Sequence, residues 1–488
     1  MKNTFLLSFV LIFLVTSNVF ASSDFTFSNI KPDDFFGHDI ELIGDLDGDG
    51  VTDIVVGVPY DNDGANSAGA VYILFLNSDG TVKSSQKISS SEGNFREKLE
   101  AYDAFGRSVA NLGDFDGDGI TDIVVGAYHD DDGGYNTGAV YILFLNSDGT
   151  VKSSQKISSS EGNFKGVIDS GDCWGNAITV LNDFDGDGVT DIAVGAHKNY
   201  SPGSEMKRVG AVHILFLNSD GTVKSSQEIS DTKGNFKGII KDNNVFGIDL
   251  TNLNDLDGDG ITDIAVGAFG DNDGANSAGA VYILFLNSDG TVKSSQKISS
   301  SEGKFQIELD DSDKFGYSID NIGDLNNDNI IDIAVGAPGD DDVRELVNFE
   351  SGETSSSRGA VYILFLNSDG TVKSSQKISS SEGNFREKLE LEDSFGFSLS
   401  KLGDLNGDGI TDIAVGSPHR HYFNSDLSPL HILFLNSDGK VISFETIPEQ
   451  HNVENVFDSS YLLLIILLIV IIPVLLIRKK FKLKNTTA

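Results

Sequence analysis

The stretch Asp45-Leu46-Asp47-Gly48-Asp49-Gly50-Val51-Thr52-Asp53 decides the fold of this chain. It returns five more times, beginning at Asp114, Asp183, Asp255, Asp324 and Asp404. Places 1, 3, 5 and 9 carry Asp, with Asn at place 3 of two copies, and places 4 and 6 are Gly in most copies. Gly takes a positive φ at little cost, so the backbone can turn sharply there. Oxygen ligands at this spacing are typical of a site for a hard divalent cation, and we expect calcium.

Each copy offers the same candidate ligands. Side chains at places 1, 3, 5 and 9 supply carboxylate or amide oxygens, and the main-chain carbonyl of place 7 points inward as a further ligand. The candidate ligands are Asp45, Asp47, Asp49, Val51 and Asp53; Asp114, Asp116, Asp118, Ile120 and Asp122; Asp183, Asp185, Asp187, Val189 and Asp191; Asp255, Asp257, Asp259, Ile261 and Asp263; Asp324, Asn326, Asp328, Ile330 and Asp332; Asp404, Asn406, Asp408, Ile410 and Asp412. We expect about six Ca²⁺ ions, held more weakly in the fifth copy, where Asn replaces both glycines and one Asp.

A single copy has two other interpretations. An EF-hand loop needs a bidentate Glu at place 12 followed by a helix, whereas place 12 here is Val56 in a short apolar, β-branched run that predicts a buried strand. A metal-free Asp/Gly hairpin turn is the second interpretation. Six copies with the same acidic spacing argue against it, because carboxylates without a counter-charge repel one another.

The metal loop belongs to a longer repeat that opens with an aromatic residue and Gly. The openings lie near residues 36, 105, 174, 246, 315 and 395, with Trp174-Gly175 in the third. Each repeat predicts four strands, of which the third is apolar on both faces and therefore central, while the fourth is polar and outermost. Four-stranded units repeated in this way predict an all-β chain folded as a β-propeller of antiparallel blades, with an open solenoid as the alternative.

These repeats resemble the FG-GAP family, which forms the blades of the integrin α-subunit propeller. The resemblance rests on Phe-Gly, on the acidic loop, and on Val335-Gly336-Ala337-Pro338, and it covers about residues 35–448. It implies a propeller with calcium in the first hairpin of each blade, on the face opposite the variable loops. Integrin propellers have seven blades, whereas six are visible here. We expect six, and a degenerate seventh blade built from Phe25–Phe27 and the C-terminal residues is the alternative.

The two ends of the chain predict targeting segments. Residues 1–21 combine Lys2, an apolar run and small residues at the end, as in a cleaved secretory signal. Residues 459–477 are long and apolar enough to predict a transmembrane helix, and the lysines and arginine in residues 478–488 place that tail in the cytoplasm. We therefore expect a single-pass cell-surface protein whose propeller ectodomain, residues 22–458, lies outside.

Charge and cysteine content exclude several classes of function. The net charge of −39 argues against nucleic acid and anionic lipid as partners. Cys173 is the sole cysteine, so no intramolecular disulfide forms, and any cross-link that stabilises the fold must come from bound metal. We expect Cys173 and Trp174 to pack at a blade edge. No Ser-His-Asp, Walker or zinc-protease signature is present, so we expect no enzyme.

The repeats diverge mainly between their second and third strands, and we expect these loops to form the ligand face. Lys198, Lys207 and Arg208 make a basic spot there, a weak candidate for an acidic sugar or carboxylate, and Asn199 is a weak candidate for glycosylation. His419, Arg420 and His421 offer a transition-metal or acid-base site. The runs 130–132 and 340–342 offer either further cation sites or solvated turns. In each case solvated charge is the alternative.

The sequence thus predicts a calcium-binding surface propeller that adheres to or recognises an extracellular protein or glycan. Two other functions stay open at this point. One is a non-catalytic structural component of the cell envelope, and the other is an extracellular polysaccharide hydrolase or lyase that uses the divergent loops. A pocket with paired carboxylates or a perturbed His favours the enzyme, and an apolar rim favours the structural role.

Overall fold

The computed structural model describes residues 34–77, 82–198, 209–341, 357–387, 393–404, 406–417 and 430–447, together with Lys31 and Leu389. The predicted signal segment, the Phe25–Phe27 strand, the transmembrane segment and the basic tail lie outside these residues. Within the described ranges no helix is long and apolar enough to cross a membrane.

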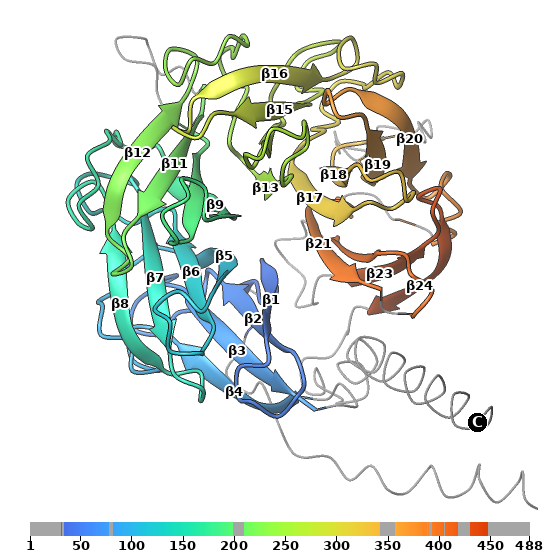
Figure 1. Cartoon of the computed structure of the whole chain (residues 1–488). Helices are drawn as coiled ribbons and strands as arrows, with labels where there is room; N and C mark the ends of the chain where they lie inside the picture. Colours follow the sequence, from blue (N-terminus) through green and yellow to red (C-terminus); the bar gives the residue numbers. More distant parts are fainter. Residues whose placement is uncertain are drawn as a thin grey trace, which may run out of the picture.

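Six four-stranded antiparallel sheets, here called blades 1 to 6, are arranged around a common centre (Figure 1). Blade 1 contains β1 (Ile40–Gly44), β2 (Asp53–Val58), β3 (Ala70–Leu76) and β4 (Val82–Ile88); blade 2 contains β5 (Phe105–Gly113), β6 (Asp122–Ala127), β7 (Ala139–Leu145) and β8 (Val151–Ile157); blade 3 contains β9 (Trp174–Asn182), β10 (Asp191–Ala196), β11 (Ala211–Leu217) and β12 (Val223–Ile229). Blade 4 contains β13 (Leu250–Asn252), β14 (Ile264–Ala268), β15 (Ala280–Leu286) and β16 (Val292–Ile298); blade 5 contains β17 (Ser318–Gly323), β18 (Asp332–Ala337), β19 (Ala360–Leu366) and β20 (Val372–Ile378); blade 6 contains β21 (Ser398–Gly403), β22 (Asp412–Gly416), β23 (Leu430–Leu435) and β24 (Val441–Ile447). The prediction of an all-β, six-bladed propeller is confirmed.

Strands follow one another in chain order from the centre outward in every blade. β1 and its equivalents line the centre and β4 and its equivalents form the rim (Figure 1). The whole of β3 is buried, because its apolar side chains pack against blade 2 on one face and against other residues of blade 1 on the other face. Lys83 to Lys87 of β4 are exposed or half-buried. The predicted central and outermost positions of the third and fourth strands are therefore confirmed.

Antiparallel order sends alternate connections to opposite faces of the ring. The loop between the first and second strands of each blade lies on what we call the metal-loop face. The loop between the second and third strands lies on the other side, which we call the variable-loop face, together with the connection to the next blade. These two sets of segments are hydrogen-bonded, since Tyr102 N–H donates to the Asn66 carbonyl at 2.8 Å and Gly171 N–H to the Tyr135 carbonyl at 2.7 Å.

Glycines join neighbouring blades backbone to backbone, which explains the two short motifs of the repeat. A Cβ on Gly126, which follows Val125 in the second strand of blade 2, would lie less than 3.0 Å from the carbonyl oxygen of Gly175 in the Trp174-Gly175 pair of blade 3. The same pairing joins blades 1 and 2, 3 and 4, 4 and 5, and 5 and 6. A single parallel β-bridge, such as that between Gly138 and Trp174, accompanies the glycine pairing at each of these five seams. Only glycine allows the backbones to approach this closely.

The seam between blade 6 and blade 1 differs from the other five. In the part of the chain that the structure describes, no bridge joins these two blades. In the other blades the glycine equivalent to Gly416 lies against a carbonyl oxygen of the next blade. The nearest atoms to a Cβ on Gly416 of blade 6 all belong to Ser398 of its own blade, and Gly37 of blade 1 is not among them. The segments that the seven-blade alternative invoked lie outside the described residues.

Candidate metal centres

The acidic loop of blade 1 is folded around its own carboxylates. Asp45 accepts a hydrogen bond from Gly50 N–H at 2.8 Å, and Asp49 accepts one from Val51 N–H at 2.9 Å. Gly48 and Gly50 have φ of 78° and 86°, as the sequence predicts for places 4 and 6. In blade 5 Asn327 and Asn329 adopt the same left-handed region, with φ of 60° and 66°. The Asn substitutions therefore preserve the shape of the loop.

The Asp at place 9 ties the loop to the core of its blade. In blade 4, Asp263 is buried and accepts hydrogen bonds from Leu286 N–H of β15 and from Leu256 N–H of the loop, both at 3.0 Å. Burial raises the pKa of Asp263 to about 7, the two backbone bonds oppose this, and the charge of Asp257 adds to it. In each blade the second strand begins at place 9 or at the next residue, so the structure confirms that a strand follows the loop and not an EF-hand helix.

Carboxylates converge in four of the loops. Within each set, one oxygen per residue lies within 4.8 Å of the others, and the sets are Asp45, Asp47 and Asp53; Asp114, Asp116 and Asp118; Asp183, Asp185 and Asp187; Asp255, Asp257 and Asp259. In blades 5 and 6 the place-3 ligand is an amide, Asn326 or Asn406. The buried oxygens Asp257 Oδ1 and Asn326 Oδ1 have no hydrogen-bond partner among the described residues. A set of carboxylate and amide oxygens, some without a partner, fits a hard cation such as Ca²⁺.

Lysines from the rim strands contact these loops, which the sequence analysis missed. Lys83, the second residue of β4, places its Nζ 2.6 Å from Asp47 Oδ2 and 2.8 Å from Asp49 Oδ2. Lys152, Lys224 and Lys293 make the same pair of contacts, and Lys373 contacts Asp328 at 2.6 Å. Blade 6 has Ile442 at this position. Four loops therefore have an ammonium beside places 3 and 5, the loop of blade 5 has one beside place 5, and blade 6 has an apolar side chain at that position of its rim strand.

Lys293→Ile gives blade 4 the residue type that blade 6 has at this position. We expect it to strengthen calcium binding by the blade 4 loop about two- to fivefold, the range for an exposed ion pair. The ammonium and the metal compete for the same carboxylate oxygens of Asp257 and Asp259. Calcium titration by calorimetry measures this, with Lys98→Ile as the control, because in the described part of the chain Lys98 pairs with Glu100 at an exposed site and with none of the loop carboxylates. Equal calcium affinity in the two variants would contradict competition.

The opposite face carries a second repeated polar network. Lys156 Nζ lies 3.0 Å from Asp130 Oδ2, which also accepts a hydrogen bond from the Tyr141 hydroxyl at 2.9 Å. Asp132 accepts hydrogen bonds from Ser158 and Ser160. In the run 130–132, Asp130 is thus buried and already paired with the half-buried Lys156, whereas Asp131 is exposed. Blades 1, 4 and 5 repeat the ion pair, as Lys87–Asp61, Lys297–Asp271 and Lys377–Asp340.

The other predicted site residues are only partly described. Lys198 N–H donates to the Asp172 carbonyl, and the charge of Lys198, after burial, helps to lower the pKa of His129 to about 4. Cys173 and Trp174 are buried, as expected; Trp174 packs between blades 2 and 3, and Cys173 packs against Ala104 and Tyr128. Outside the described residues lie Asn199, Lys207, Arg208, His419, Arg420 and His421.

Comparison with known proteins agrees with this architecture. The FG-GAP repeat model matches residues 41–74, 105–143, 174–215, 246–284 and 395–433, in blades 1 to 4 and 6. Integrin alpha-2 of Mus musculus is 32% identical over 236 residues, which are 47% of this chain and 16% of that protein. Integrin alpha-PS2 of Drosophila melanogaster is 29% identical over 258 residues, which are 52% of this chain and 16% of that protein. The chain therefore carries FG-GAP repeats and is similar, over about half of its length, to a small part of these integrin α subunits.

Proposed function

We propose that this protein is a non-catalytic, calcium-stabilised propeller held at the cell surface, where its variable-loop face recognises an extracellular protein or glycan. Similarity to integrin α subunits supports an adhesive or recognition role. The apolar segment 459–477 and the basic tail after it support anchoring through the C-terminus. The acidic net charge of −39 disfavours nucleic acid as the partner.

The location of exposed apolar side chains carries this proposal. Tyr102, Tyr135, Val167 and Ile239 are 61%, 71%, 60% and 73% exposed, and all four belong to segments of the variable-loop face. They come from connections between blades 1 and 2, 2 and 3, and 3 and 4, and from the β6–β7 loop. Tyrosines at a protein surface supply much of the contact energy in recognition, and exposed apolar groups gathered on one face mark interaction sites.

We expect Tyr135→Ser to weaken binding of the full-length protein to its target cells at least about tenfold, as for a tyrosine at the centre of an interface. Ile442→Ser is the matched control, because Ile442 is 56% exposed on the rim strand β24 and lies off the variable-loop face. The measurement is saturable binding to whole cells and to a glycan panel with calcium present.

Equal losses in the two variants would contradict the choice of face. Absence of any binding by a folded, calcium-loaded protein would overturn the recognition function itself.

A further inference from the structure

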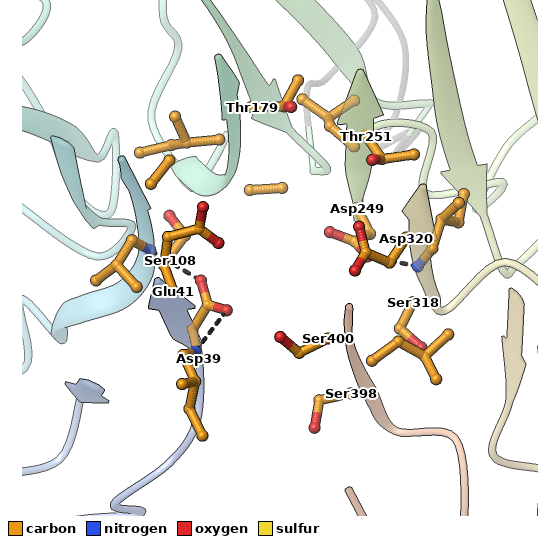
Figure 2. A pocket seen from close by; sticks show the side chains of 18 of the residues that line it. Asp39, Glu41, Ser108, Thr179, Asp249, Thr251, Ser318, Asp320, Ser398 and Ser400 are labelled. Carbon is orange, nitrogen blue, oxygen red and sulfur yellow. Dashed lines mark hydrogen bonds between the residues drawn. The ribbon is translucent and has the colours of Figure 1, made fainter. Parts of the chain in front are cut away.

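A cavity of about 310 Å³ lies on the axis of the ring, between the first strands of all six blades (Figure 2). Four carboxylates line it. Asp39 and Glu41 come from blade 1, Asp249 from blade 4 and Asp320 from blade 5. The remaining blades place Ser, Thr or Ala at the corresponding positions, such as Ser108, Ala110 and Ser400. The wall of this channel is therefore acidic on two sides, although the blades are otherwise close copies.

Three of the four carboxylates have a structural role. Asp39 accepts a hydrogen bond from Val109 N–H of blade 2 at 2.8 Å, and Asp249 accepts one from Ile319 N–H of blade 5 at 2.7 Å. Asp320 accepts one from Lys401 N–H of blade 6 at 2.6 Å. These bonds join the first strands of neighbouring blades, and they explain why an acid stands at each of the three positions.

Glu41 has no such role. Among the described residues no hydrogen bond or ion pair reaches its carboxylate, which points into the channel (Figure 2). Thr251, at the same position in blade 4, accepts a hydrogen bond from Asn321 N–H at 3.2 Å, so the position can serve the fold without a charge. Glu41 is half-buried, so its carboxylate faces the cavity and not the packed core. A charge there that has no counter-charge beside other acids is less favourable than one that a bound cation neutralises.

The positive charges near the channel do not supply that partner. Arg107 also lines the cavity, and its Nε donates to Asn176 Oδ1 at 3.0 Å while its Nη1 contacts the His38 ring. Within the described chain, none of the four carboxylates forms an ion pair. Burial, followed by the charges of Asp320 and Asp39, raises the pKa of Glu41 to about 8, and burial raises the pKa of Asp249 to about 7. Burial also raises the pKa of Asp39 and Asp320 to about 6.

The distance between the carboxylates also sets a lower limit on the size of the cation. Asp39 and Glu41 face Asp249 and Asp320 across the channel (Figure 2). In the described part of the chain, the sets of acidic oxygens that lie within 4.8 Å of one another are those of the metal loops, and the channel carboxylates form none. A bare metal ion would therefore not reach three of them. A larger cation with hydrogen-bond donors on two sides fits both walls.

We propose that the axial channel binds one cation that presents N–H or O–H donors to both walls, with Glu41 as its main anionic contact. A short aliphatic diamine presents two ammonium groups, and a hydrated divalent metal ion presents bound water; both have this chemistry. The site is separate from the six loops and does not depend on the recognition function.

The test compares the full-length protein with Glu41→Gln, which keeps the shape of the side chain and removes its charge. In one arm, 1,4-diaminobutane is titrated by calorimetry in calcium-free buffer. In the other, equilibrium dialysis counts the Ca²⁺ ions bound at saturation. We expect a tenfold or greater loss of diamine affinity, the scale of one charge-assisted hydrogen bond, or one fewer Ca²⁺ ion per chain. Glu100→Gln, at an exposed position, should match the wild type.

The first result would identify the diamine as the ligand and the second would identify the metal. Equal diamine affinity and equal calcium counts in wild type and Glu41→Gln would overturn the proposal. Binding at pH 7 should also release protons, because a cation favours the ionised form of Glu41 and lowers its pKa. Calorimetry in buffers of different ionisation enthalpy measures this release.

A second variant keeps the test decisive if Glu41→Gln fails to fold. Ser400→Lys places an ammonium on the channel wall, where Ser400 projects toward the cavity (Figure 2). We expect this variant to bind neither diamine nor the additional calcium ion and to melt above the wild type. A variant that melts lower and still binds the cation would contradict the proposal.

Discussion

Removal of calcium with a chelator is expected to lower the melting temperature of the full-length protein by about 10 °C. Sites of extracellular modules bind calcium at about 10⁻⁴–10⁻³ M. At free calcium tenfold to a hundredfold above that, each occupied loop gains about 1.4–2.7 kcal/mol. The gain acts on the native state, because the carboxylates of a set such as Asp45, Asp47 and Asp53 converge only when the loop is folded.

Thermal melting with calcium, with chelator, and with chelator followed by excess calcium measures this effect. The third condition is the control, since it must restore the original melting temperature. Equal melting temperatures with and without calcium would show that calcium does not stabilise the folded protein. The five lysines that contact the loops make the effect smaller than six unneutralised loops would give, because each ammonium already offsets part of the repulsion.

The second large effect is expected from Gly126→Ala, which should destabilise the protein by about 3 kcal/mol or more. The new methyl group would lie less than 3.0 Å from the carbonyl oxygen of Gly175, so blades 2 and 3 must separate to admit it. The backbone of Gly126 is not in the left-handed region, so the cost comes from the collision and not from φ. The shift in the urea denaturation midpoint measures it.

Gly134→Ala is the matched control in the same blade. The nearest atoms to its new methyl group are side-chain carbons of Thr137 and Ser170, at 3.2 Å and 3.6 Å. Because these can move, we expect a change of less than about 1 kcal/mol. A similar midpoint for the two variants would show that the seam between blades tolerates a larger spacing than the structure has.

Much of the fold could be predicted from the sequence because each blade repeats the same local signals. The apolar run of β3 predicts a central strand, and the polar run of β4 predicts a rim strand. The left-handed places of the loop follow from Gly48 and Gly50, and even from Asn327 and Asn329 in blade 5. Spacing alone also brings the carboxylates of four loops together, as the structure confirms.

The contacts that were missed join residues far apart in the chain. The approach of Lys83 to Asp47 depends on the register of β4 against β3, and periodicity does not give that register. The pairing of Lys87 with Asp61 could have been found by comparing the repeats. In blade 3, His213 and Glu228 stand together in the places of Tyr72 and Lys87, so the partners change as a group.

The channel could not be anticipated for a different reason. Asp39 and Asp320 belong to blades that are distant in the sequence, and only closure of the ring brings their first strands around one axis. A single repeat shows that one side of its first strand carries an acid or a small polar residue. It does not show that this side faces five other strands.

The repeated glycine seams have a consequence for how the chain reaches this structure. Residues 61–93 and 271–303 are identical, and five neighbouring pairs of blades meet through the same backbone contact. A newly formed blade therefore presents a surface that several other blades fit almost equally well. Docking of the wrong pair is then limited mainly by the short connection that holds each blade beside its successor. Synthesis from the N-terminus favours the correct order. When a new blade emerges, the blade just before it is the one that still has a free packing surface.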